Sequence, residues 1–237
     1  MKLSIIIPSF NEQATIESVL DRICSVVLNQ VDEKEIIVVD DCSKDSTREI
    51  VDAFIKKNSG KNITYVRHEK NMGKGAAIRT GIQNATGDFT IIQDADLELD
   101  PEDINLLLQP VFKSKADVVF GSRFAGGSNP RSILTYRHNF ANKFLTGFSN
   151  LLSNMNLTDM ETCYKLARTS IFKKIKIEED KFGFEPEITA KLSKLKQLHF
   201  FEVGISYYPR SRAEGKKIGW SDGFRAIYCI IKYNLFR

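Results

Sequence analysis

Acidic side chains gather where two predicted strands end. Asp40 and Asp41 follow one apolar run, and Asp94, Asp96 and Glu98 follow another. Carboxylates two residues apart at a strand-to-loop turn can converge on one hard divalent cation, the usual means of holding a nucleotide diphosphate. A single acidic pair is more often a turn or a helix cap. Because two such clusters are expected at one sheet edge, we interpret them as a site for a metal-bound diphosphate.

A glycine-containing segment, residues 71–75 (NMGKG), precedes a predicted helix. Free backbone N–H groups and the helix dipole favour an anion at such a position. The segment does not match the P-loop signature, and no G-x-G-x-x-G follows the first strand, which argues against a dinucleotide-binding Rossmann protein. A tight turn would also explain the two glycines.

The elements that must position these residues alternate between strands and helices. Strand-like apolar runs span residues 3–7, 35–39, 63–66, 89–93, 117–120, 164–167 and 200–208. Helical patterns span about 46–57, 75–84, 136–155 and 186–196, with another helix beginning at Pro101 and a helical tail. Continuous apolar strands between helices predict an α/β fold, with a mostly parallel sheet covered on both faces. Ligands of such sheets bind at the carboxyl ends of the strands.

Two predicted helices carry clear apolar stripes. The first helix is expected after residues 9–12 (SFNE), which fit a capping box, and its stripe is Ile16, Val19, Leu20, Ile23 and Val27. The second stripe is Phe140, Phe144, Leu145, Phe148, Leu151, Leu152 and Met155. We interpret the second stripe as core. The alternative is an interfacial membrane anchor, formed by this helix or by the tail with Phe224, Ile227, Tyr228, Ile231 and Tyr233.

Composition sets limits on the class of protein. The 237 residues are 42% hydrophobic and 27% charged, which is typical of a globular chain and excludes disorder, collagen-like repeats and a disulfide-stapled miniature. The four cysteines form no C-x-x-C, so neither a zinc site nor a disulfide framework is indicated and a reducing compartment is expected. We expect one domain, residues 1–237. No signal peptide and no stretch of roughly 20 apolar residues is found, so the chain is expected to be soluble or peripheral.

The charge is unevenly distributed along the chain. Residues 1–120 hold 14 Lys and Arg against 20 Asp and Glu, whereas residues 121–237 hold 20 against 10. Such asymmetry often accompanies an anionic partner, such as nucleic acid, a phosphorylated ligand or a membrane surface. Solvated basic helices would explain it equally well.

Taken together, the motifs resemble those of a known enzyme family. Residues 5–12 (IIIPSFNE), 38–41 (VVDD), 71–75 (NMGKG) and 93–98 (QDADLE) resemble a family 2 glycosyltransferase of GT-A fold. Further segments resemble its polyprenyl-phosphate branch, which includes dolichyl-phosphate mannosyl- and glucosyltransferases: 121–124 (GSRF), 137–138 (RH), 157–162 (LTDMET), 182–185 (FGFE), 207–210 (YYPR) and 215–217 (GKK). The ordered set covers nearly the whole chain and is specific, although no single motif is.

The resemblance implies a metal-dependent, inverting transfer of a hexose, mannose or glucose, from a GDP- or UDP-sugar to a polyprenyl phosphate. It implies that Mg²⁺ or Mn²⁺ binds at Asp94, Asp96 and Glu98, with Asp96 also catalytic. The residues implied to bind the donor are Pro8, Ser9, Asn11, Glu12, Asp40, Asp41, Lys74, Gly75, Asp94, Arg210 and Lys216. Residues 1–120 would form the nucleotide-sugar half and residues 121–237 the acceptor half.

On the acceptor side, the resemblance implies that Arg123 and Arg137 bind the acceptor phosphate. Arginine suits this role because its planar fork can bind two phosphate oxygens. Asp159 is the candidate for orienting or deprotonating the acceptor. The expected location is cytoplasmic, peripheral on the cytoplasmic face of the membrane, with no nucleic-acid partner.

Other functions remain open at this point. The nearest alternative is a family 2 transferase with a saccharide acceptor in cell-envelope polysaccharide synthesis, in which Asp159 would be an obligatory base. A nucleotidyltransferase would also use clustered aspartates. A basic binding module would explain the charge of the second half but not the acidic strand ends.

Overall fold

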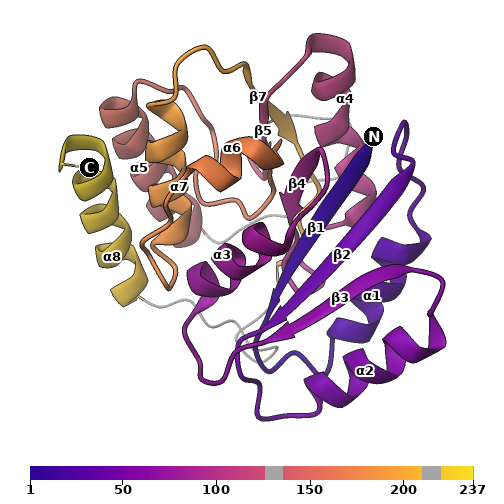
Figure 1. The fold of residues 1–237 in the computed structure, drawn as a ribbon. Helices are drawn as coiled ribbons and strands as arrows, with labels where there is room; N and C mark the ends of the chain where they lie inside the picture. The colour runs from indigo at the N-terminus through magenta and orange to yellow at the C-terminus, as the bar shows by residue number, and fades with distance from the viewer. Residues whose placement is uncertain (126–135, 210–219, 237) are drawn as a thin grey trace.

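Seven strands form one sheet in a computed structural model that describes residues 1–125, 136–209 and 220–236 (Figure 1). The side chains of residues 136–138, 220 and 221 lie outside this description. The strands are β1 (Lys2–Ser9), β2 (Glu33–Asp40), β3 (Asn62–Arg67), β4 (Phe89–Ile92), β5 (Val118–Ser122), β6 (Lys165–Arg168) and β7 (Phe200–Gly204), in the order β3-β2-β1-β4-β6-β5-β7. Strand β6 is antiparallel to both its neighbours, β4 and β5, and the other pairs are parallel. The predicted mostly parallel sheet is confirmed.

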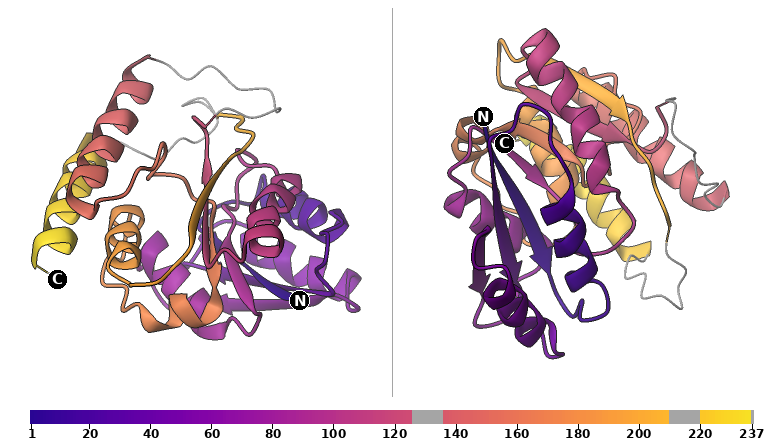
Figure 2. Two further views of the ribbon diagram at one scale, coloured as in Figure 1. Left: turned by 90° about the horizontal axis from the view of Figure 1, so that it is seen from above. Right: turned by 90° about the vertical axis from the view of Figure 1, so that its right-hand side faces the viewer.

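Helices cover both faces of this sheet, as Figure 1 and Figure 2 show. Helices α1 (Ile16–Ser25), α2 (Thr47–Lys57) and α4 (Ile104–Ser114) lie on one side, and α3 (Lys74–Asn84), α6 (Thr169–Lys174) and α7 (Phe184–Ser193) lie on the other. The 3₁₀ turn η1 (Pro101–Asp103) leads into α4, so a helix does begin at the predicted proline. The remaining helices, α5 (Tyr136–Ser153) and α8 (Trp220–Ile231) with the π-helical turn η3 (Lys232–Phe236), lie side by side at the end of the molecule far from β3.

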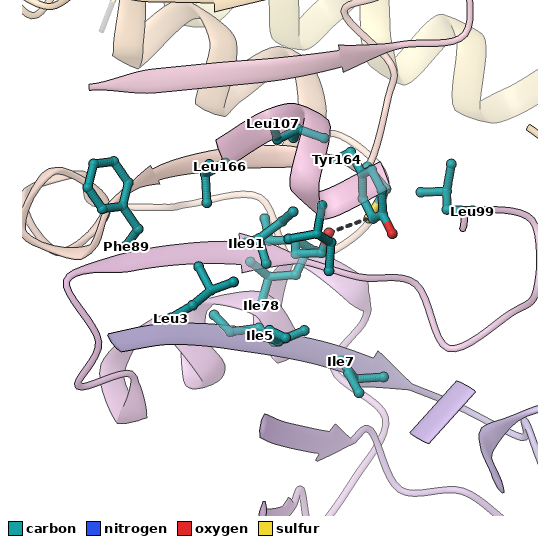
Figure 3. Packing of buried hydrophobic residues seen from close by; sticks show 14 of the residues in the cluster. Leu3, Ile5, Ile7, Ile78, Phe89, Ile91, Leu99, Leu107, Tyr164 and Leu166 are labelled. Atoms are coloured by element: carbon teal, nitrogen blue, oxygen red, sulfur yellow. Dashed lines mark hydrogen bonds between the residues drawn. The ribbon is translucent and has the colours of Figure 1, made fainter. Parts of the chain in front are cut away.

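The core lies between the sheet and these helices. Runs of β-branched and other apolar residues make strands that are buried on both faces, so Ile5, Ile91 and Leu166 on three neighbouring strands are all inaccessible to solvent. Figure 3 shows these side chains packed together with Ile78 of α3. The rigid sheet that results fixes the positions of the loops at its edges.

Three local predictions need correction. Ser9 is still in β1 and α1 begins only at Ile16, where the N-cap Thr15 makes no side-chain capping bond, so the predicted capping box is wrong. The stripe of α1 is buried as far as Ile23, but Val27 lies beyond the helix end and is 78% exposed. The predicted strand 200–208 stops at Gly204, and beyond it the Ser206 N–H donates to the Asp103 side chain and the Tyr208 N–H to the Glu98 carbonyl.

The interpretation of the 140–155 stripe as core is wrong for three of its residues, whereas Met155 packs against the core. Phe140, Phe144 and Leu151 are 63%, 54% and 77% exposed. The buried side of α5 carries small polar residues instead, such as Thr146, whose Oγ1 accepts a hydrogen bond from the Met160 N–H at 3.2 Å. No helix in the described part of the chain has the length and apolarity needed to cross a bilayer.

Candidate active site

Most of the predicted site residues that the structure describes meet at one edge of the sheet. The parallel strands β1, β2, β4 and β5 end there, which brings residues 8–12, 40–41, 93–98 and 122–124 to the same edge. Because β6 runs the opposite way, its beginning lies at this edge too, and residues 158–165 join the others. The clustering expected from the sequence is therefore present.

The residues after β1 bind the loop after β2. The Asn11 N–H donates to Ser43 Oγ at 2.9 Å, and Asn11 Oδ1 accepts from the Lys44 N–H at 2.8 Å. Asn11 has a φ of 53°, in the left-handed region that asparagine tolerates. Glu12 donates its N–H to Thr47 Oγ1, while the buried Ser9 Oγ has no hydrogen-bond partner in the described structure. Pro8 is half-buried at the end of β1.

The carboxylates of Asp40 and Asp41 are buried and already bonded within the chain. Asp40 accepts hydrogen bonds from Tyr65 Oη at 2.6 Å and the Ser43 N–H at 2.9 Å. Asp41 accepts from the amides of Met72 and Gly73 at 2.8 and 2.6 Å, and His68 Nδ1 lies 2.7 Å from Asp41 Oδ1. Both aspartates thus hold neighbouring loops in place, and their direct contact with a nucleotide stays a prediction.

Other segments of the chain accept hydrogen bonds from backbone amides near the start of α3. The Ala76 N–H donates to the Asp180 carbonyl at 3.1 Å, and the amides of residues 72 and 73 are taken by Asp41. A Cβ on Gly75 would lie 2.1 Å from the Glu179 carbonyl oxygen, and one on Gly73 would lie 2.3 Å from that of Asp180. The glycines are therefore needed for close packing, and anion binding by the backbone N–H groups at this helix start stays a prediction.

Lys74 reaches from this helix into the acidic edge. Its Nζ lies 2.8 Å from Asp94 Oδ1 and 3.3 Å from Glu185 Oε1. Burial alone would lower the pKa of Lys74, but the charges of Asp94 and Glu185 raise that pKa well above its ordinary value. Lys74 is therefore a fixed cation at the first carboxylate of the predicted metal site.

The other two predicted metal ligands also have partners. Asp96 Oδ1 accepts a hydrogen bond from the Glu98 N–H at 3.1 Å, and Glu98 Oε2 accepts one from Tyr207 Oη at 2.8 Å. Among the described residues, no three His, Cys, Asp or Glu side chains are grouped as a ready-made metal site. Three carboxylates on one loop nevertheless supply the hard oxygen donors that Mg²⁺ and Mn²⁺ take, so the donor chemistry of Asp94, Asp96 and Glu98 fits.

On the acceptor side, Arg123 and Asp159 form a buried two-point ion pair. Arg123 Nε and Nη2 donate to Asp159 Oδ2 and Oδ1 at 2.7 and 2.8 Å, and the Arg123 N–H donates to Oδ2 at 3.0 Å. Asp159 is inaccessible to solvent. Burial by itself would lower the pKa of Arg123. The charge of Asp159 raises that pKa by a larger amount, so the guanidinium stays charged. The structure thus brings these two predicted residues into direct contact.

Sequence reasoning assigned no role to Glu161, which lies next to this pair. The side chain is half-buried, and its Oε1 is inaccessible and has no hydrogen-bond partner among the described residues. Burial and the nearby charge of Glu185 raise the pKa of Glu161 to about 7. The nearby Lys165 is fully buried and donates to the Met160 and Thr162 carbonyls, and burial lowers its pKa. The buried charges around Glu161 could not be detected from the sequence, because only the fold brings residues 161 and 185 together.

Three predicted site residues cannot be placed. Arg210 and Lys216 lie outside the described residues, as does the side chain of Arg137.

Comparison with known proteins identifies the family. The sequence model of Glycosyl transferase family 2 matches residues 4–176, well over half of the chain. The chain belongs to this family. It is a glycosyltransferase, as the motifs predicted, and its sheet and helices have the predicted GT-A fold.

Relatives of this glycosyltransferase support the predicted branch. It is 30% identical over 235 residues to a dolichyl-phosphate beta-glucosyltransferase of Dictyostelium discoideum, covering 91% of this chain and 68% of the relative. It is 29% identical to a dolichol-phosphate mannosyltransferase of Pyrococcus furiosus, covering 98% and 64%. It is 26% identical to a dodecaprenyl-phosphate galacturonate synthase of Rhizobium johnstonii, covering 100% and 67%. The glycosyltransferase thus spans about two thirds of the length of these relatives.

A solved structure confirms the fold. Glucosyl-3-phosphoglycerate synthase of Mycobacterium tuberculosis, in complex with Mn²⁺, UDP and phosphoglyceric acid, superposes with a TM-score of 0.70 at 20% identity. The match covers 100% of this chain and 79% of the synthase. At that identity the similarity extends to the fold alone.

Proposed function

We propose that this glycosyltransferase moves a hexose, mannose or glucose, from GDP or UDP to a polyprenyl phosphate. The observation that carries the proposal is that one sheet edge holds both the acidic loop of residues 94–98 and the buried guanidinium of Arg123. The first suits a metal-bound diphosphate and the second suits a phosphate acceptor. Relatives named for transfer to dolichyl and dodecaprenyl phosphates support the choice of acceptor.

A divalent metal belongs to this proposal. Asp94, Asp96 and Glu98 would hold Mg²⁺ or Mn²⁺, and the similarity in fold to a synthase solved with Mn²⁺ and UDP supports a metal. When bound, the metal supplies Lewis-acid stabilisation of the charge on the departing diphosphate. Lys74, already fixed beside Asp94, adds a second positive charge at the same place.

The reaction is a single displacement with inversion. A phosphate oxygen of the acceptor forms the bond to the anomeric carbon, and the bond from that carbon to the nucleoside diphosphate breaks. A lipid phosphate is already anionic near neutral pH, so this attack needs no strong base. Asp159 accepts from Arg123 Nε and Nη2 with both carboxylate oxygens, which orients the guanidinium that we propose binds the acceptor phosphate.

The outer face of α5 and α8 supports a proposed peripheral attachment to a membrane. Phe140 and Phe144 on α5 are exposed, as are Phe224, Tyr228 and Ile231 on the adjacent α8. Aromatic and aliphatic side chains on adjacent helices suit insertion between lipid headgroups, and exposed Lys143 adds attraction to anionic lipid. We place this face against the cytoplasmic side of the membrane, where a polyprenyl phosphate would present its headgroup.

Glu161 favours one second candidate, a hydroxyl acceptor on a saccharide. A hydroxyl must lose a proton on attack, and a carboxylate whose pKa is about 7 is suited to take it. The two acceptors are distinguished by Glu161→Gln. With a hydroxyl acceptor this change should lower the turnover rate by about 100-fold or more, whereas with a phosphate acceptor it should change the rate less than about tenfold.

The test of the main proposal is product formation from labelled nucleotide sugars. Each GDP- and UDP-hexose is mixed with a short polyprenyl phosphate and Mg²⁺ or Mn²⁺, and lipid is extracted into organic solvent. Labelled lipid that forms only with metal supports the proposal and identifies the sugar. Labelled saccharide without labelled lipid would overturn the phosphate acceptor in favour of the second candidate.

A further inference from the structure

Tyr207 lies between the metal loop and the acceptor-side ion pair. Its Oη donates to Glu98 Oε2 at 2.8 Å. The Arg123 guanidinium carbon lies 5.1 Å from the centroid of the Tyr207 ring, within the range of a cation–π contact. One buried side chain, 8% exposed, therefore touches both a proposed metal ligand and the arginine proposed to bind the acceptor.

The backbone around Tyr207 is fixed at three points. The Ile205 N–H donates to the Ser122 carbonyl at 3.0 Å, the Ser206 N–H to Asp103 Oδ2 at 2.5 Å, and the Tyr208 N–H to the Glu98 carbonyl at 2.9 Å. Tyr207 also forms an isolated β-bridge with Leu99. This segment cannot shift without moving the end of β5 or the metal loop, so the ring and hydroxyl of Tyr207 are held in place.

The two contacts act on different parts of the reaction. A phenol that donates to a carboxylate restricts how that carboxylate can turn, and groups of this kind beside metal ligands commonly change metal affinity by 10–100-fold. The Tyr207 ring packs against the Arg123 guanidinium, together with the Phe124 ring, whose centroid lies 5.7 Å from the guanidinium carbon. The hydroxyl contacts Glu98, and the ring would remain against Arg123 if the hydroxyl were removed.

We propose that Tyr207 is a positioning residue that holds Glu98 for the metal through its hydroxyl and Arg123 for the acceptor through its ring. This proposal rests on the proposed function, since it takes Glu98 as a metal ligand and Arg123 as an acceptor contact. It adds a residue that the motif at 207–210 contains and to which sequence reasoning gave no role.

The test compares the full chain with Tyr207→Phe, Tyr207→Leu and the control Tyr208→Phe, whose side chain is 51% exposed. Calorimetry measures Mn²⁺ binding in the presence of UDP and, separately, GDP, without any acceptor. Tyr207→Phe should weaken Mn²⁺ binding about tenfold and raise the KM for polyprenyl phosphate less than Tyr207→Leu does. Tyr207→Leu should weaken Mn²⁺ binding equally and also raise the acceptor KM roughly threefold to tenfold. Tyr208→Phe should change neither quantity.

A double-mutant cycle checks that the hydroxyl acts through Glu98. In the Glu98→Ala background, Tyr207→Phe should no longer affect Mn²⁺ binding. An undiminished effect there, or Mn²⁺ affinity in Tyr207→Phe within twofold of the unmodified chain, overturns the proposal. Tyr207→Phe keeps the ring and its packing. It therefore tests the proposed effect on metal binding even if Tyr207→Leu fails to fold.

The outcomes separate this proposal from the proposed function. If no donor yields labelled lipid but Tyr207→Phe still weakens Mn²⁺ binding, the acceptor assignment fails and the positioning of Glu98 stands. If the unmodified chain binds no Mn²⁺ with either nucleotide, the metal site and the role of Tyr207 are both overturned. If lipid product forms and the Tyr207→Leu acceptor KM is unchanged, the ring has no part in holding Arg123.

Discussion

The two halves of the sheet edge use buried charge in opposite ways. Near β1 and β2, the carboxylates of Asp40 and Asp41 are bonded to loops of the same chain. Near β6, Glu161 Oε1 is inaccessible and has no hydrogen-bond partner within the described parts of the chain, and the helices beyond it expose aromatic side chains. Buried polar groups are normally paired, so a fully bonded carboxylate shapes a site, while an unpaired one indicates where a ligand or proton is handled. Acidic residues that look alike in the sequence thus fall into two classes.

The largest expected effect belongs to Asp96, which is only half-buried in the metal loop. Asp96→Ala should lower transfer by about 1000-fold, equivalent to ~4 kcal/mol of barrier, because it removes a proposed metal ligand. The thermal midpoint should change little. Near-normal activity in this variant, measured with saturating Mn²⁺, would sink the metal assignment.

Asp41→Ala should mainly lower the stability of the fold, whereas Asp96→Ala should mainly lower the activity. Asp41→Ala leaves two half-buried amides and His68 without their acceptor, so the free energy of unfolding should fall by about 3 kcal/mol, measured by chemical denaturation. The matched control is Asp52→Ala, which removes a half-exposed ion pair with Arg48. It should lower the free energy of unfolding by less than about 0.5 kcal/mol. If Asp41→Ala proved as stable as the control but lost nucleotide binding, Asp41 would belong to the ligand-handling class.

Glu161 gives a pH-dependent effect of intermediate size. Its pKa is about 7 in the folded chain and near 4.5 when unfolded, so the folded state binds more protons between these values. Stability contributed by the protonated form is present below pH 4.5 and is lost as pH rises through 7. Between pH 5 and pH 8 the unmodified chain should therefore lose on the order of 2 kcal/mol of unfolding free energy that the Glu161→Gln variant does not lose. Denaturation curves at both pH values measure this, and parallel pH profiles would show that Glu161 does not titrate there.

The smallest effect concerns the exposed aromatic face. Phe140→Ser and Phe224→Ser should each weaken binding to anionic vesicles about fivefold, equivalent to ~1 kcal/mol, as measured by co-sedimentation. Val27→Ser is the control, because Val27 is equally exposed but follows α1, on the other side of the molecule. An equal loss with the control would show that the face of α5 and α8 has no special role.

The sequence predicted the sheet, its parallel sense and the edge that holds the site, because these depend on local apolar runs and on chain order. The core-facing residues Ile16, Val19, Leu20 and Ile23 were predictable for the same reason. It could not show that Phe140 and Phe144 face outward, since a helical stripe has the same spacing whether it meets protein or lipid.

Contacts between distant residues were also beyond the sequence. The pairing of Lys74 with Asp94 and Glu185, and that of Arg123 with Asp159, join segments 20 to 111 residues apart. The motifs identified the residue types, but they could not show which carboxylate each lysine or arginine side chain pairs with. The partners of Asp41 were missed because a strand-end carboxylate looks the same whether it binds a ligand or a loop.

The antiparallel direction of β6 has an evolutionary consequence. The chain leaves the sheet at Ser122 and returns at Lys165 on the same edge, and the two ends of this excursion are tied together by Ser122 with Thr158 and by Arg123 with Asp159. A segment whose ends meet within hydrogen-bond distance can be lengthened, shortened or exchanged without disturbing the strands on either side. If the proposed function holds, we expect changes in this segment to alter acceptor preference and to leave the donor side of the site intact.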